Sequence, residues 1–145
     1  MTIVIVGNGM YVSGRGTKGY GTIMPAIFEY IRRGGNSIKE IKMVGTNRSG
    51  AIKSQKKVNE LMAKMGISIK VKTYPADSEN SSVSYEHVLG NIDLPACAIV
   101  AVPDHLHYEI ARCCLINGLH TLVVKPLTPT TEEAIKLTKL ASEKN

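Results

Sequence analysis

The sequence contains few of the residues that define specialised protein classes. Its 145 residues include no tryptophan, one phenylalanine and three cysteines. Cys97, Cys113 and Cys114 are odd in number and two are adjacent, which argues against a disulfide framework. No pair has the CxxC spacing of a zinc site, so we expect no metal. We therefore expect the three cysteines to be small buried apolar residues that remain reduced in the cytoplasm.

Long hydrophobic runs are missing as well. No segment approaches the roughly 20 apolar residues that a transmembrane helix requires, so no membrane partner is expected. Met1 leads directly into apolar residues 3–6, without the basic segment that begins a secretory signal. Apolar residues make up 43% and charged residues 21% of the chain, which excludes a disordered protein. The length fits one domain over residues 1–145.

Acidic residues are scarce relative to basic ones. Eighteen Lys and Arg against twelve Asp and Glu give a net charge of +6, which predicts an anionic partner. Nucleic acid is a poor candidate, because the chain lacks a set of stacking aromatics and a recognisable binding motif. Between Arg32 and Lys72 there are eleven basic residues but only two acids, Glu40 and Glu60. We expect most of these basic side chains to form a solvated helix surface.

Strand-like and helix-like segments alternate along the chain. Apolar runs predict buried strands at residues 3–6, 41–45, 67–71, 97–102 and 121–124. Three- and four-residue spacing predicts helices at 23–31, 51–65, 105–116 and 131–142, with one further helical turn at 85–89 and a polar loop at 77–84. This alternation implies a mostly parallel sheet covered on both faces. Right-handed crossovers then make a doubly wound α/β fold of three layers, the Rossmann fold.

A glycine-rich segment follows the first expected strand. It begins with Gly7, Asn8, Gly9 and Met10. In a doubly wound fold the first glycine permits a tight turn, and the second lets the backbone approach a pyrophosphate. Val12 occupies the position of the third glycine of a GxGxxG motif, and the segment continues to Gly21, so we expect the helix to begin only after it. Arg15 and Lys18 place cations among the glycines, which favours a phosphate-binding loop over a flexible insertion without a ligand role.

The end of the second expected strand lacks a carboxylate. In NAD-binding domains an acidic residue there holds the ribose hydroxyls. Here the segment contains Asn47, Arg48 and Ser49, with Asn47 at the position expected for the acid. A carboxylate would repel a 2′-phosphate, whereas an arginine with nearby hydroxyls can bind it through forked hydrogen bonds. The segment therefore predicts NADP as the preferred cofactor, with NAD as the alternative.

The residues after the fourth and fifth expected strands resemble a known family. The relevant segments are Val102-Pro103-Asp104-His105-Leu106-His107, then Gly118 to Pro126, then Thr131-Glu132-Glu133-Ala134. They are similar, in this order, to the "TPxxxH", "GkhVlvEKP" and "eea" segments of the glucose–fructose oxidoreductase / inositol dehydrogenase (Gfo/Idh/MocA) family. The resemblance covers essentially the whole chain and corresponds to the N-terminal dinucleotide-binding domain of that family.

The resemblance implies an NAD(P)-dependent oxidoreductase acting on a sugar-like small molecule. Such an enzyme transfers a hydride between the nicotinamide and a carbon that bears a hydroxyl or carbonyl group. By the same resemblance, Val102 and Pro103 line the nicotinamide end of the site, and His107 lies near it. Lys125, followed by Pro126, faces the reacting centre in a catalytic or positioning role. A buried lysine there would polarise a substrate oxygen, and its desolvation would favour proton transfer.

The chain departs from the family pattern at two motif positions. The glutamate of "EKP" is replaced by Val124, and the threonine of "TPxxxH" by Val102. The first change leaves open a second interpretation, a dinucleotide-sensing regulator without catalysis, although the retained Lys125 argues against it. The C-terminal α/β substrate domain of the family is absent from these residues. We therefore expect the chain alone to bind dinucleotide without turnover, and the full-length protein to form a homo-oligomer.

Overall fold

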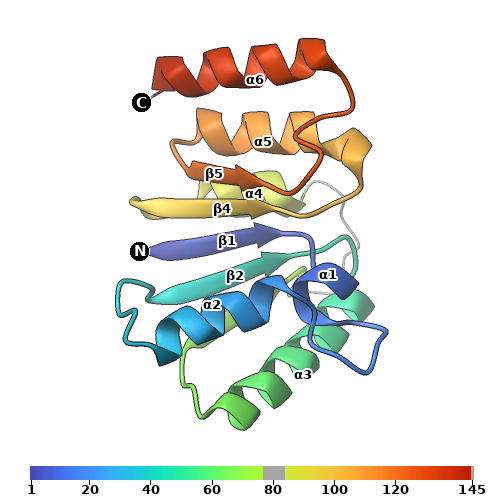
Figure 1. Cartoon of the computed structure of the whole chain (residues 1–145), viewed down its shortest axis with the longest axis vertical. Coiled ribbons are helices and arrows are strands. Elements are labelled where there is room, and N and C mark those ends of the chain that lie inside the picture. The colour runs from blue at the N-terminus through green and yellow to red at the C-terminus, as the bar shows by residue number, and fades with distance from the viewer. Residues whose placement is uncertain (77–83, 145) are drawn as a thin grey trace.

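The computed structural model describes residues 1–76 and 84–144, so nearly all of the loop expected at 77–84 lies outside it. Five strands form one parallel sheet in the order β3-β2-β1-β4-β5 (Figure 1). The strands are β1 (Thr2–Val6), β2 (Glu40–Val44), β3 (Lys70–Tyr74), β4 (Ala96–Val100) and β5 (His120–Val123). The helices are α1 (Met10–Ser13), α2 (Ile23–Arg32), α3 (Arg48–Met65), α4 (Ser84–Gly90), α5 (His107–Ile116) and α6 (Thr131–Lys144), with a 3₁₀ turn at Asp104–Leu106. The expected doubly wound fold is confirmed.

The alternating side chains of β1 separate two hydrophobic cores. Ile3 and Ile5 pack with α1, α2 and α3 on one face of the sheet, where Phe28 is fully buried. Val4 and Val6 point to the other face and pack with α4 and α5. Because successive residues of a strand point to opposite faces, one apolar strand serves both cores. The outermost helix, α6, packs against α5 (Figure 1). This arrangement produces the three layers predicted from the sequence.

The third strand lies further along the chain than predicted. The expected strand at 67–71 is wrong in position, because β3 runs from Lys70 to Tyr74. Gly66 ends α3 in the left-handed conformation with φ of 66°, and the N–H of Ile67 donates to the carbonyl of Met62. This helix-ending hydrogen bond uses the first residues after Gly66 to reverse the chain. The strand therefore starts only once the chain has reached the sheet edge.

The glycine-rich segment contains a helix that the sequence pattern did not predict. The short helix α1 (Met10–Ser13) begins directly after Gly9, so the expectation that no helix precedes Gly21 is wrong. Gly14 ends α1 after one turn, since its φ of 73° is left-handed and its N–H donates to the carbonyl of Met10. Val12, at the position of the missing third glycine, is 1% exposed and belongs to the core beneath the loop. The start of the glycine-rich segment is therefore ordered and packed against the core.

The three cysteines are free, as expected. Cys114 on α5 is fully buried in the core, whereas Cys97 and Cys113 are half-buried. Burial raises the pKa of the Cys114 thiol to about 12, and the neighbouring Cys113 adds to the shift. Desolvation penalises the thiolate, which keeps this thiol neutral and unreactive in the native protein.

Replacing Gly7 by alanine should destabilise the sheet. Gly7 has φ of 118°, and an added Cβ would overlap the carbonyl oxygen of Ala101 at the end of β4. Gly34 is the matched control, since its φ is 94° but no atom lies within 4 Å of an added Cβ. We expect Gly34→Ala to cost roughly 1–3 kcal/mol through backbone strain alone, and Gly7→Ala to cost more. Urea unfolding measures the free energy of unfolding of both variants. Equal losses for the two would contradict the close approach of Gly7 to the carbonyl of Ala101.

The buried thiol of Cys114 predicts a pH-dependent contribution to stability. Its pKa in the folded chain is about 12, above the usual 9.0, so the unfolded chain loses this proton first as pH rises. The contribution of the neutral Cys114 thiol to the free energy of unfolding is therefore complete below about pH 9 and declines toward pH 12. We expect the advantage of wild type over Cys114→Ala in urea unfolding to shrink between pH 8 and pH 10.5. If the difference in free energy of unfolding between wild type and Cys114→Ala stays constant over this range, the raised pKa of Cys114 is contradicted.

Candidate functional site

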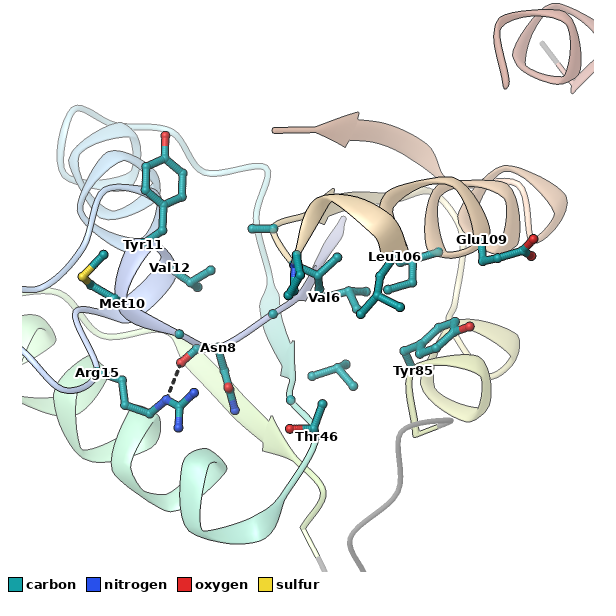
Figure 2. Close-up of a pocket in the computed structure, with 18 residues that line it drawn as sticks. Val6, Asn8, Met10, Tyr11, Val12, Arg15, Thr46, Tyr85, Leu106 and Glu109 are labelled. Carbon is teal, nitrogen blue, oxygen red and sulfur yellow. Dashed lines mark hydrogen bonds between the residues drawn. The ribbon is translucent and has the colours of Figure 1, made fainter. Parts of the chain in front are cut away.

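A cavity of about 490 Å³ opens at the carboxyl ends of β1, β2 and β4 (Figure 2). It is lined by residues 6–12 with Arg15, residues 44–46, Tyr85, residues 101–103, Leu106, Glu109 and Ile110. After β3 the chain crosses to the other side of β1 to form β4, so the strand order reverses between β1 and β4. Doubly wound sheets bind ligands at this point of reversal. The volume lies in the range of small-molecule and cofactor sites.

The two glycines after β1 have different roles. The N–H of Gly7 donates to the carbonyl of Val44 at 2.7 Å, and the N–H of Ala101 donates to the carbonyl of Val6 at 2.9 Å. The chain therefore turns away from the sheet while still bonded to both neighbouring strands. A Cβ added at Gly9 would meet no atom within 4 Å, and no side chain caps the start of α1. Gly9 thus leaves open space above backbone N–H groups, which suits the approach of an anion.

The backbone carbonyl of Asn8 joins three segments of this site. It accepts hydrogen bonds from Ser54 Oγ of α3 at 2.6 Å, Arg15 Nε at 3.1 Å and Ser13 Oγ of α1 at 3.2 Å. The residue is 5% exposed and lines the cavity. Ser54 is fully buried, so the hydrogen bond from α3 is shielded from water. These contacts hold the glycine turn against α3.

The side chain of Asn8 points into the space between Arg15 and Thr46 (Figure 2). Its Nδ2 is buried and has no hydrogen-bond partner within the part of the chain that the structure describes. A Cβ at Gly45 would overlap this amide, so glycine at that position makes room for it. An unpartnered buried donor carries a free-energy penalty of roughly 1–3 kcal/mol. A ligand with an acceptor atom in the cavity would remove this penalty.

The cofactor-binding residues predicted at the end of β2 do not act together: one caps a helix, and the others are exposed. Asn47 caps α3, since its Oδ1 accepts a 2.7 Å hydrogen bond from the N–H of Gly50. This cap explains why α3 begins at Arg48, earlier than the expected start at residue 51. Arg48 and Ser49 are exposed on the first turn and do not line the cavity. Val44, Gly45 and Thr46 line the cavity, and Thr46 is the exposed polar side chain among them.

His107 is completely buried and does not line the cavity. Its Nδ1 lies 2.7 Å from the carbonyl oxygen of Pro126, and its Nε2 lies 2.9 Å from that of Val102. The imidazole therefore connects the segments that follow β4 and β5. A neutral imidazole has one N–H and donates to one of these oxygens, whereas an imidazolium donates to both. The structure places His107 behind the site, where it holds the two motif segments together.

Lys125 is exposed, so the expectation of a buried lysine at this position is wrong. It follows β5, the edge strand, in which exposed and half-buried side chains alternate. Lys125 and Pro126 do not line the cavity at β1, β2 and β4. Among the predicted site residues the structure brings together Gly7, Asn8, Gly9, Met10, Val102 and Pro103. Lys125 lies apart from this group, at the next strand end.

Two cavity residues had no signal in the sequence. Tyr85 lines the cavity from α4, and Glu109 lies at its border on α5. Burial raises the pKa of the Tyr85 phenol above its usual value, and the carboxylate of Glu86 adds to this. Neither residue belongs to a motif, and only the packing of α4 and α5 on the same face of the sheet brings them to the cavity. In the described ranges no group of three or more metal-ligand side chains occurs.

The fold and the glycine turn define the class of protein: a nucleotide-binding domain of the Rossmann type, with its cavity at the topological switch point. None of its helices in residues 1–76 and 84–144 is long and apolar enough to cross a membrane. The chain belongs to the Gfo/Idh/MocA family, described as "Oxidoreductase family, NAD-binding Rossmann fold", which matches residues 1–145. The family predicted from the strand-end motifs is therefore confirmed.

Curated relatives match part of the chain. An uncharacterized oxidoreductase of Synechocystis sp. is 39% identical over 72 residues, which cover 48% of this chain and 19% of the relative. The scyllo-inositol 2-dehydrogenase (NADP(+)) IolW of Bacillus subtilis is 44% identical over 46 residues, which cover 32% of this chain and 13% of that enzyme. The matched segments thus span less than a fifth of either relative.

Solved structures share the fold over nearly the whole chain. KijD10, a 3-ketoreductase from Actinomadura kijaniata solved with TDP-benzene and NADP, matches with a TM-score of 0.61 at 19% identity. The match covers 99% of this chain and 35% of KijD10. The WlbA dehydrogenase of Chromobacterium violaceum, solved with NADH and UDP-GlcNAcA, has a TM-score of 0.61 at 15% identity and coverages of 99% and 32%. The chain corresponds to about a third of each structure.

Removing the His107 imidazole should destabilise the fold. In His107→Phe the carbonyls of Val102 and Pro126 lose their shared partner while the space stays filled. We expect a loss of roughly 1–3 kcal/mol in the free energy of unfolding. His105→Phe is the matched control, because His105 is exposed in the neighbouring 3₁₀ turn and should change little. Urea unfolding compares the two variants, and similar values for both would rule out the bridging role.

Proposed function

We propose that the chain is the dinucleotide-binding domain of an NAD(P)-dependent oxidoreductase that acts on a sugar-like substrate. The observation that carries the proposal is the cavity at the point of strand reversal, with Gly9 open to it and an unpartnered Asn8 amide inside it. Family membership supports the same assignment. The substrate class rests on relatives named as an inositol dehydrogenase and a ketoreductase.

The residues present fit a dinucleotide. Open space at Gly9 accommodates a pyrophosphate against the backbone of residues 7–10, and the Asn8 amide supplies a buried donor. Val102 and Pro103 provide apolar surface on the β4 side of the cavity. When bound, nicotinamide supplies the hydride donor or acceptor. This cavity surrounds its ligand mostly with backbone and apolar side chains, which bind and orient while excluding water.

In this proposal Lys125 acts on the substrate and His107 positions the segment that carries it. The Lys125 ammonium is exposed at the end of β5, where it is free to donate to a substrate oxygen and polarise its bond to carbon. His107 holds the next carbonyl, that of Pro126, at 2.7 Å. The same imidazole holds Val102 beside the cavity. One buried side chain thus fixes the relative position of the cofactor and substrate segments.

The proposal extends to the cofactor preference, the compartment and the assembly. No carboxylate occurs in residues 44–49, and the first turn of α3 contains Arg48 but no acid. This charge pattern favours NADP over NAD, with Arg48 contributing from the exposed side of the segment. Three free thiols suit the cytoplasm. By its family the full-length enzyme is proposed to be a homo-oligomer.

Placing a carboxylate at the end of β2 should reverse the cofactor preference. Thr46 lines the cavity and is exposed, so Thr46→Asp adds a negative charge without disturbing the core. We expect wild type to bind NADPH at least about 10-fold more tightly than NADH, and Thr46→Asp to favour NADH. Arg48→Ala should weaken NADPH binding a few-fold, because exposed charges are screened. Fluorescence titration with both nucleotides measures these affinities.

Two outcomes would count against this proposal in different ways. If wild type binds neither nucleotide, the assignment as a dinucleotide-binding domain is wrong. If wild type and Arg48→Ala both prefer NADH equally, the domain assignment stands but the NADP preference is wrong. Circular dichroism of each variant separates either outcome from a loss of fold.

A further inference from the structure

We propose that Arg15 and the Asn8 amide form a built site for a phosphate monoester, which within the proposed function is the adenosine 2′-phosphate of NADP(H). The site lies at the β2 side of the cavity, where the first turn of α3 begins. The inference rests on the proposed function for the identity of the ligand. It assigns the main phosphate contact to the glycine-rich loop, whereas the sequence pattern pointed to Arg48.

Contacts of Nε and Nη1 hold the guanidinium of Arg15 in place. Its Nε donates to the carbonyl of Asn8 at 3.1 Å, and its Nη1 packs so closely on Gly50 that an added Cβ would lie 2.9 Å away. The hydrogen bonds and ion pairs of the described residues use none of its remaining N–H groups. The side chain is half-buried and lines the cavity. A fixed guanidinium with its terminal donors free is suited to an anion with several oxygens.

The Asn8 amide provides an independent indication of a ligand. Its Nδ2 is buried without a partner and points into the same space as Arg15 (Figure 2). Both groups present N–H donors, and the acceptor they lack is a negatively charged or strongly polar oxygen. The pyrophosphate is expected elsewhere, at Gly9 and the start of α1. In this fold the ribose lies at the end of β2, so a phosphate on its 2′ oxygen would reach Arg15 and Asn8.

The loop that carries Arg15 is anchored on α3 before any ligand arrives. Lys57 Nζ donates to the carbonyl of Gly19 at 3.2 Å. Its ammonium and that of Lys64 lie 5.1 and 5.5 Å from the centre of the Tyr20 ring, within the range of cation–π attraction. Thr17 Oγ donates to the carbonyl of Gly14 at 2.9 Å. Because the loop is already ordered, little conformational entropy is lost when the phosphate binds.

The test compares three variants in titrations with NADPH and NADH. Arg15→Gln removes the guanidinium. Lys18→Gln removes an equal charge from the same loop, at an exposed position that the structure places outside the cavity lining, although the sequence pattern had grouped it with Arg15. We expect Arg15→Gln to weaken NADPH binding by about 10- to 100-fold, the range for hydrogen bonds to charged groups. NADH binding should change less than about threefold, and Lys18→Gln should leave both affinities within about threefold.

Gly50→Ala tests the position of the guanidinium while retaining its charge. The new methyl group would lie 2.9 Å from Nη1, and so displace it, and 3.2 Å from the capping Oδ1 of Asn47. Alanine is the better helix former, so we expect folding to be preserved, which circular dichroism checks. We expect Gly50→Ala to lower the affinity for NADPH, but by a smaller factor than Arg15→Gln does. Equal effects of Arg15→Gln and Lys18→Gln would overturn the inference in favour of general charge attraction. Equal losses for NADPH and NADH would overturn it in favour of pyrophosphate contact.

A titration without nicotinamide separates this inference from the proposed function. Adenosine 2′,5′-bisphosphate should bind wild type more tightly than adenosine 5′-monophosphate, and Arg15→Gln should abolish the difference. If this holds while neither dinucleotide binds, the phosphate site stands and the oxidoreductase assignment fails. If the two nucleotides bind equally while NADH still binds, the phosphate site is overturned and the proposed function is retained.

Discussion

The backbone carbonyl of Asn8 is the interaction on which the site depends. Donors from α1, from the glycine-rich loop and from α3 converge on this one oxygen, with Ser54 the shortest at 2.6 Å. The oxygen is available because Gly7 turns the chain out of the sheet with φ of 118°, a conformation that side chains disfavour. One glycine thus exposes the carbonyl that fixes the loop, the helix and the arginine around the cavity.

A second buried contact organises the other end of the site. His107 connects the segments that follow β4 and β5, which are neighbouring strands of the parallel sheet. The family motif histidine therefore lies behind the strand-end segments and joins them. Together the Asn8 carbonyl and the His107 imidazole hold the loops of a site whose own lining is largely backbone and apolar surface.

Much of the fold could be predicted because the core demands a regular pattern. The strands other than β3 lie within two residues of their expected bounds, since buried apolar runs leave little freedom in register. The errors occur where local hydrogen bonds decide. Gly66 reverses the chain and delays β3, Asn47 caps α3 and starts it early, and Gly14 permits α1 within a segment that had no helical periodicity. Such effects involve single residues and leave no periodic signal.

The sequence by itself determined the family, the order of the strands along the chain and the glycine turn after β1. These follow from local composition and from short motifs with fixed spacing. Only the tertiary structure decided which side chains share the cavity: Arg15 lines it and Arg48 does not, Tyr85 joins it from α4, and Lys125 is exposed beyond it. The reason is that packing brings together residues that are distant in the chain. No local sequence pattern indicates that the loop carrying Arg15 folds back on α3.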